Sequence, residues 1–114
     1  MPLPEFTKKL IEVRLSKYCT NRISEDGRDN LRLIFNINEN IVTLILTRPY
    51  FKDRSKWAER SVAQIRFDNE NKKWMLYFID RNEGWHPYDL IEPSSDFEDL
   101  LKELDCDPTG IFWG

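Results

Sequence analysis

The sequence predicts an α+β domain: an N-terminal helix, a five-strand antiparallel meander, a C-terminal helix and an apolar C-terminal tail packed on the core. Apolar and polar residues alternate with a period of two through most of residues 31–88, as in strands with one buried face. Apolar residues at helical spacing come before and after that region. Three large apolar residues precede the terminal glycine: Ile111, Phe112 and Trp113. Leaving them in water would forgo about 1.5–3 kcal/mol of burial per side chain, so we expect a packed tail.

The composition fits one domain, residues 1–114, of an ordinary water-soluble protein. Hydrophobic residues make up 40% and charged residues 32% of the chain, which argues against disorder. No apolar run approaches the roughly 20 residues of a membrane span, so we expect no membrane contact. No basic segment followed by an apolar one opens the chain, so no signal peptide is expected. Cys19 and Cys106 lie far apart, which favours a reduced, cytoplasmic protein over one with a disulfide.

The net charge of −3 conceals an asymmetry along the chain. Residues 1–66 carry a net charge of +5 and residues 67–114 carry −8. A basic first half favours nucleic acid as a ligand. Alternatively, the two halves face each other in the fold and partly neutralise one another.

The first helix is expected over residues 4–19, with Pro4 in its first turn. It carries two apolar stripes instead of one, which are Phe6, Leu10 and Val13, and Ile11, Leu15 and Tyr18. A helix with two apolar stripes usually contacts two surfaces. One would be the sheet, and the other would be the C-terminal helix or the partner in a homodimer.

Five segments have strand character, and they are residues 31–37, 41–47, 61–68, 74–79 and 85–88. A basic segment, 48–57, is expected to connect the second and third strands as a long loop. Pro87 cannot donate a hydrogen bond to a neighbouring strand, so the last strand is expected at an edge of the sheet.

The C-terminal helix has the clearest start signal in the chain. Ser95 and Glu98 have the spacing of a capping box, in which each side chain satisfies a backbone N–H group. An apolar face follows at helical spacing, made of Phe97, Leu100, Leu101 and Leu104.

Several motifs resemble the bacterial family catalogued as domain of unknown function 3024. They include Arg48-Pro49, Trp57-Ala58-Glu59, residues 63–67, residues 74–77, residues 85–88, and the closing segment 105–114. The resemblance covers roughly residues 20–114, and the closing segment is its most specific part. It implies a complete, single-domain bacterial protein, and it brings no known activity, cofactor or catalytic residue.

The basic segment, extended to Arg60, is the first candidate site. Five cations occur within thirteen residues, and they are Arg48, Lys52, Arg54, Lys56 and Arg60. Tyr50, Phe51 and Trp57 interleave with them. Cations that neutralise phosphates, beside aromatic rings that stack bases, are typical of single-stranded nucleic-acid sites. The alternative is a solvated loop whose aromatic rings fold back onto the sheet.

Other candidates are weaker. His86 is the only histidine, and the spacings of Cys19 and Cys106 are not those of a zinc site, so no metal or cofactor is expected. A small hydrolase would need His86 close to Asp105 or Asp107 in the fold. Both carboxylates also suit a turn at Asp-Pro-Thr-Gly, and His86 suits an exposed position on an edge strand.

Aromatic residues on neighbouring strands, Trp74, Tyr77, Trp85 and Tyr88, provide a third candidate surface. They would stack bases on an open sheet or pack in the core. The sequence thus favours a non-enzymatic binding module with nucleic acid as first candidate ligand. The alternatives are a regulator that binds a protein partner through a sheet edge or the first helix, and the hydrolase.

Overall fold

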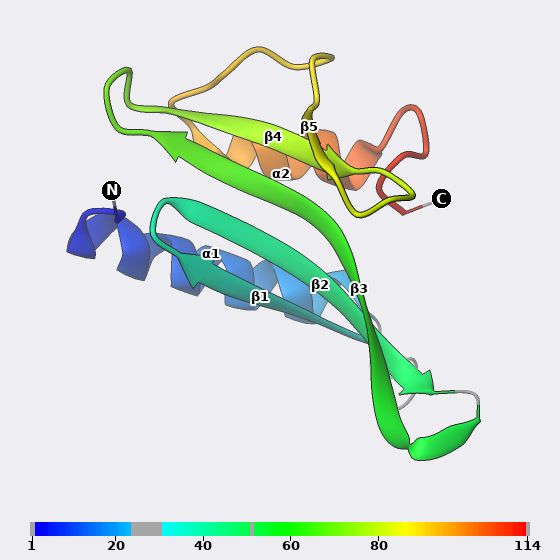
Figure 1. Cartoon of the computed structure of the whole chain (residues 1–114). Helices are drawn as coiled ribbons and strands as arrows, with labels where there is room; N and C mark the ends of the chain where they lie inside the picture. The colour runs from blue at the N-terminus through cyan, green and yellow to red at the C-terminus, as the bar shows by residue number, and fades with distance from the viewer. Residues whose placement is uncertain (1, 24–30, 51, 114) are drawn as a thin grey trace.

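The computed structural model describes residues 2–23, 31–50 and 52–113. Two helices flank a sheet of five strands, and the elements are α1 (Glu5–Arg22), β1 (Arg32–Asn38), β2 (Ile41–Tyr50), β3 (Asp53–Asp68), β4 (Lys73–Ile79), β5 (Trp85–Pro87) and α2 (Phe97–Cys106). Adjacent strands pair antiparallel in the order β1-β2-β3-β4-β5, so sheet order follows chain order (Figure 1). The expected α+β class and five-strand meander are confirmed.

Helix α1 begins directly after Pro4, whose φ of −55° suits the start of a helix. It continues to Arg22, three residues beyond the expected end. One of its two apolar stripes is buried through Ile11 and Leu15, and Cys19 extends the buried side by one turn. The other stripe is exposed to solvent, so the helix faces the sheet with one side only.

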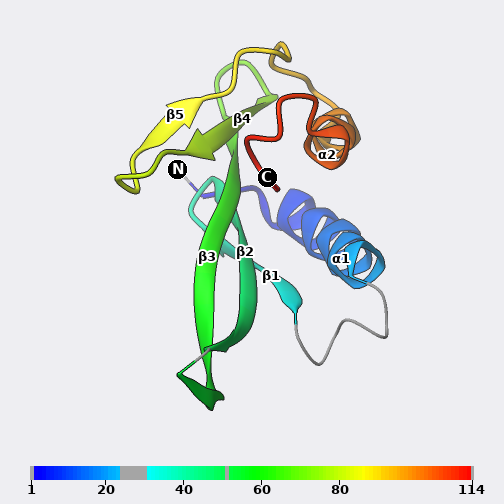
Figure 2. The same cartoon turned by 90° about the vertical axis from the view of Figure 1, so that its right-hand side faces the viewer.

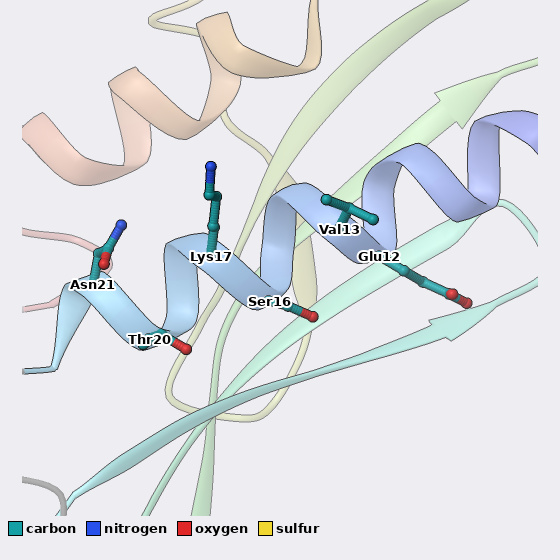
Figure 3. Close-up of a pocket in the computed structure, with 6 residues that line it drawn as sticks. All are labelled: Glu12, Val13, Ser16, Lys17, Thr20 and Asn21. Atoms are coloured by element: carbon teal, nitrogen blue, oxygen red, sulfur yellow. The ribbon is translucent and has the colours of Figure 1, made fainter.

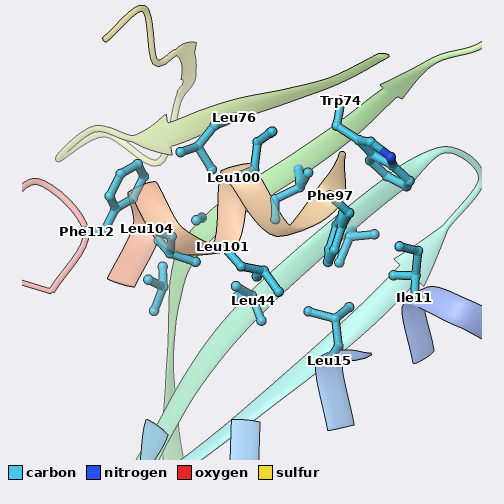
Figure 4. Packing of buried hydrophobic residues seen from close by; sticks show 14 of the residues in the cluster. Ile11, Leu15, Leu44, Trp74, Leu76, Phe97, Leu100, Leu101, Leu104 and Phe112 are labelled. Carbon is cyan, nitrogen blue, oxygen red and sulfur yellow. The ribbon is translucent and has the colours of Figure 1, made fainter. Parts of the chain in front are cut away.

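Both helices cover the same face of the sheet (Figure 2). α1 contacts β1, and α2 contacts β4, so each helix covers one end of the meander. The core lies between these layers, and its largest fully buried side chains are Leu15, Val42, Leu44, Val62, Ile65, Leu76, Leu100, Leu104 and Phe112 (Figure 4). The opposite face of the sheet carries neither described helix.

The segment expected to be a basic loop is a β-hairpin arm instead. β2 continues to Tyr50 and β3 begins at Asp53, so most of residues 48–57 is paired. The β2–β3 arm, as we name residues 48–60, projects past the helices and accounts for the long dimension of the molecule (Figures 1 and 2). The prediction of a loop was wrong because the two strands of the arm are held together by backbone pairing. Their side chains are mostly polar, so no periodic apolar pattern in the sequence indicates these strands.

Helix α2 begins one residue later than expected. Its N-cap is Asp96, whose carboxylate accepts a hydrogen bond from the Glu98 N–H at 3.0 Å. The hydroxyl of Ser94 accepts from the Asp96 N–H at 3.0 Å and donates to the Asp99 carboxylate at 2.7 Å. The expected capping box from Ser95 is therefore replaced by this arrangement, because a carboxylate one residue further on caps the helix.

The C-terminal tail packs on the core mainly through Phe112, which is fully buried beside Tyr88 with ring centroids 5.0 Å apart. Asp107 ends α2 in the left-handed conformation and accepts from the backbone N–H groups of Phe112 and Trp113 at 3.2 and 2.9 Å. Trp113 is half-buried and donates from Nε1 to the Leu104 carbonyl at 2.9 Å. Ile111 differs from the expectation: it is 40% exposed, because consecutive residues of a turn point in different directions.

Candidate nucleic-acid interface on the β2–β3 arm

Strand pairing divides the side chains of the arm between two faces. Arg48 is paired with Ala58, and Leu46 with Arg60, so both arginines lie on the helix-covered face of the sheet. Lys56 precedes Ala58 by two residues and shares that face, because side chains alternate along a strand. Trp57 lies on the opposite face, where it pairs with Pro49.

Arg48 and Arg60 line one small cavity where the arm leaves the body. The cavity has a volume of about 210 Å³, and its other lining residues are Leu31, Leu46, Ala58 and Glu59. At roughly 30 Å³ per water molecule, this volume holds about seven waters, which leaves room for a phosphate group. The lining residues of the cavity are therefore two arginines, one glutamate and three apolar residues.

Neither arginine has a carboxylate partner among the side chains that the structure describes. In the described parts of the chain, the ion pairs of Arg14, Arg22 and His86 include neither Arg48 nor Lys56 nor Arg60. Arg60 donates one long hydrogen bond of 3.5 Å from Nη1 to the Phe112 carbonyl. Arginine presents a planar set of donors that matches a phosphate group, so this pair is suited to hold an anion.

Lys56 extends this cationic row toward the end of the arm. Lys56 and Arg60 are four residues apart on β3, which is about 13 Å at 3.3 Å per residue. Arg48 lies between them on β2, so the three side chains form one row.

The remaining predicted residues lie elsewhere on the arm. Lys52 is exposed near the tip, while Phe51 and the side chains of Tyr50 and Arg54 lie outside the described residues. The tip also holds Asp53, which accepts from the hydroxyl and N–H of Ser55 at 2.6 and 3.1 Å. These hydrogen bonds lower the pKa of Asp53, so the tip keeps one negative charge.

Trp57 is separated from three of the five cations that were expected to act with it, namely Arg48, Lys56 and Arg60. Its ring is 38% exposed and contacts the guanidinium of Arg32, which lies 4.4 Å from the ring centroid. Arg32 belongs to β1, outside the basic segment that sequence reasoning singled out. Side chains alternate between the two faces of a strand, and Arg32 lies on the same face of the sheet as Trp57. The contact depends on the register of β1 with β2 and of β2 with β3, which the sequence does not reveal.

The open face of the sheet carries a second arginine–aromatic contact. The Arg66 guanidinium lies 3.9 Å from the Tyr77 ring centroid and donates to Gln64 Oε1 from Nε and Nη2, at 3.0 and 2.7 Å. Of the four aromatic residues considered for this surface, Trp74 and Tyr88 are buried under the helices, which leaves Tyr77 and Trp85 half-buried. Sequence reasoning did not identify Arg66 as a surface residue of interest.

The residues considered for hydrolysis have separate partners. His86 Nε2 contacts Asp80 Oδ2 at 2.6 Å, and its ring stacks on Phe78 with centroids 5.4 Å apart. This hydrogen bond lowers the pKa of Asp80. Asp105 faces the Tyr18 hydroxyl and Arg22, and Asp107 caps α2 and holds the tail. None of these described contacts joins His86 to Asp105 or to Asp107, the pairing that the hydrolase alternative requires.

Three features of the described residues bear on other expectations. Cys19 and Cys106 are free thiols, the first buried and the second exposed. Histidine, cysteine, aspartate and glutamate side chains form no group of three that would hold a metal ion there. Neither helix that the structure describes is long and apolar enough to cross a membrane.

Comparison with known proteins gives one finding. The family model described as "Domain of unknown function (DUF3024)" matches residues 3–114. The match includes α1, which the motif resemblance over residues 20–114 left out. No curated protein and no solved structure matches the chain. Because the match extends over nearly the whole sequence, this chain belongs to the DUF3024 family of domains of unknown function.

Proposed function

We propose that the protein is a non-enzymatic binding module that binds nucleic acid through the helix-side face of the β2–β3 arm. The observation that carries the proposal is the cavity shared by Arg48 and Arg60, two cations without a carboxylate partner in the described chain. Lys56 continues the same face outward. Cations in a row on a projecting arm match a ligand with regularly spaced phosphates.

The separation of Trp57 from these cations determines the kind of binding. Phosphate contacts on one face and an aromatic ring on the other cannot engage the same few nucleotides of one strand. We therefore expect phosphate contacts to supply most of the affinity, with little discrimination between sequences. Single-stranded nucleic acid is the expected ligand, because its flexible backbone can follow the face into the cavity.

Binding of a fluorescently labelled single-stranded oligonucleotide, measured by anisotropy, tests this proposal. The variant R48A/K56A/R60A is expected to bind at least about tenfold more weakly than wild type, equivalent to about 1.4 kcal/mol. The matched control is K73A/R81A/K102A, which removes three exposed cations away from the arm and changes the net charge equally. Circular dichroism of both variants checks that the fold is retained.

Two outcomes would refute the proposal. Wild-type protein that binds neither single-stranded nor duplex oligonucleotide at low salt lacks the function. Equal losses of affinity in the two triple variants would mean that net charge, not the arm, attracts the ligand. If a duplex bound more tightly than the single strand, the arm would remain the proposed binding site but the ligand would be double-stranded. A two-stranded β-ribbon fits the major groove of such a duplex.

The alternative of a protein partner has one supporting observation, the exposed apolar stripe on α1. A regulator of this kind would co-purify with one specific protein at any salt concentration and would lack affinity for nucleic acid.

A further inference from the structure

The hollows that lie away from the β2–β3 arm differ in construction. One of them, along α1, has a volume of about 480 Å³, but all of its lining residues belong to that helix (Figure 3). It is therefore an open helix surface without an opposing wall. Another, of about 200 Å³, lies between β4 and the segment 87–93, which forms its second wall. We name it the β4-edge cavity, and its apolar and aromatic lining is formed by Met75, Leu76, Tyr77, Pro87, Ile91 and Pro93.

This cavity arises from a break in the pairing along β4. Pro87 stands opposite Tyr77. Continuing that register would place Leu90 opposite Trp74. Ser94 takes this place instead and exchanges two backbone hydrogen bonds with Trp74, at 2.6 and 3.0 Å. The four additional residues form a loop beside the strand (Figure 1). A break of this kind leaves ladder groups without their usual partners.

The N–H group of Leu76 is left without an acceptor at this break. In an antiparallel strand the N–H and the carbonyl of one residue point to the same neighbour. The Leu76 carbonyl accepts from the Tyr88 N–H at 2.8 Å, but no hydrogen bond of the described residues is donated by the Leu76 N–H. Leu76 is only 2% exposed. Buried backbone donors are nearly always paired, so an acceptor atom that enters the cavity would be held there.

Two carboxylates at the cavity have no cationic partner. Asp89 and Glu92 line it and are exposed. No ion pair of the described residues includes either of them. Arg66 stacks on the ring of Tyr77, but its Nε and Nη2 donate to Gln64. The charge of the lining is therefore negative, which is complementary to a cation.

We propose that the β4-edge cavity binds a small amine that also carries a carbonyl or hydroxyl oxygen. The oxygen accepts from the Leu76 N–H, as a strand carbonyl does in an unbroken sheet. A short hydrocarbon chain passes over Ile91 and Pro93, and the ammonium group lies at the carboxylates of Asp89 and Glu92. The cavity has about seven times the volume of a water molecule in the liquid, which suits a molecule of this size.

The same groups disfavour other ligands. An anion would be repelled by the two carboxylates, and a neutral apolar molecule would leave the Leu76 N–H unpaired. A lysine side chain of a protein partner would enter with its ammonium group first. It would then bring a donor, and not an acceptor, to the Leu76 N–H. A free small molecule with its cation at one end and its oxygen at the other meets both requirements.

Titration of the ¹⁵N-labelled protein with 5-aminopentanamide, followed by NMR, tests the proposal. This probe joins an ammonium group to an amide carbonyl through a short hydrocarbon chain. Formation of the hydrogen bond is expected to move the Leu76 amide proton to higher chemical shift and to slow its exchange with solvent. Pentylamine lacks the acceptor and pentanamide lacks the charge, so each should bind at least about tenfold more weakly.

A pair of matched variants tests the carboxylates. D89N/E92Q should bind the probe at least about tenfold more weakly than wild type. The control E70Q/E83Q neutralises two exposed carboxylates that do not line the cavity, and it should bind like wild type. Wild type that does not bind the probe throughout a millimolar titration would overturn the proposal. So would binding that leaves the Leu76 amide resonance unchanged, or equal losses in the two variants.

Discussion

Truncation of Phe112 tests whether the C-terminal tail is part of the core. This ring is fully buried, faces Tyr88, and packs beside Leu104 on α2 (Figure 4). Replacing a buried phenylalanine by alanine typically costs about 3–5 kcal/mol. Small domains have about 5–15 kcal/mol in total, so Phe112→Ala should remove a large share of the stability. At roughly 4 °C per kcal/mol for a chain of this size, the Tm should fall by about 12–20 °C.

Urea denaturation followed by circular dichroism measures this loss directly. The matched control is Ile111→Ala, which truncates a neighbouring residue of the same tail that is 40% exposed. We expect it to cost less than about 1 kcal/mol, as for most surface substitutions. A Phe112→Ala protein within about 1 kcal/mol of wild type would show that the tail contributes little to the core, and the burial argument would fail.

Two further predictions concern the same end of the chain and the thiols. Asp107→Ala removes the acceptor of two tail N–H groups and leaves alanine in the left-handed conformation, so a loss of about 2–4 kcal/mol is expected in urea denaturation. Asp105→Ala, whose contacts are longer and exposed, should cost under about 1 kcal/mol, and equal losses would contradict the assignment. Burial raises the pKa of Cys19 to about 11 from 9.0, whereas Cys106 is exposed. A thiol reagent at pH 8 should therefore modify Cys106 rapidly and Cys19 only upon unfolding, and two equally fast thiols would disprove the burial. Because the raised pKa favours the protonated thiol in the folded state, its stabilising contribution is complete below pH 9 and is lost as pH rises through about 11.

The sequence predicted the elements that have a strong apolar period, and it missed what depends on distant pairing. Both helices and the strands before and after the arm follow from periodicity, as at Leu100 and Leu104. Two stripes on α1 were visible, but only the packing reveals that Ile11 and Leu15 face inward. Periodicity alone does not distinguish two stripes of similar hydrophobicity.

The arm illustrates a second limit. Its strands carry polar and charged side chains, so the hydrogen-bonded backbone that holds them leaves no apolar signal. The cations were apparent from composition, but the side of the arm on which each one lies follows from the register of Arg48 with Ala58 and Leu46 with Arg60. The contact between Trp57 and Arg32 links two segments that are far apart in sequence. The sequence therefore indicated which residues form the candidate site, but not how their side chains are arranged in space.

The salt dependence of oligonucleotide binding tests the central claim most directly. For single strands, the logarithm of the affinity falls with the logarithm of salt concentration with a slope of about −0.7 per phosphate contact. If Arg48, Lys56 and Arg60 each hold one phosphate, R48A/K56A/R60A should have a slope less steep by about 2 than wild type. K73A/R81A/K102A should keep the wild-type slope. Identical slopes for wild type and R48A/K56A/R60A would contradict binding at the arm.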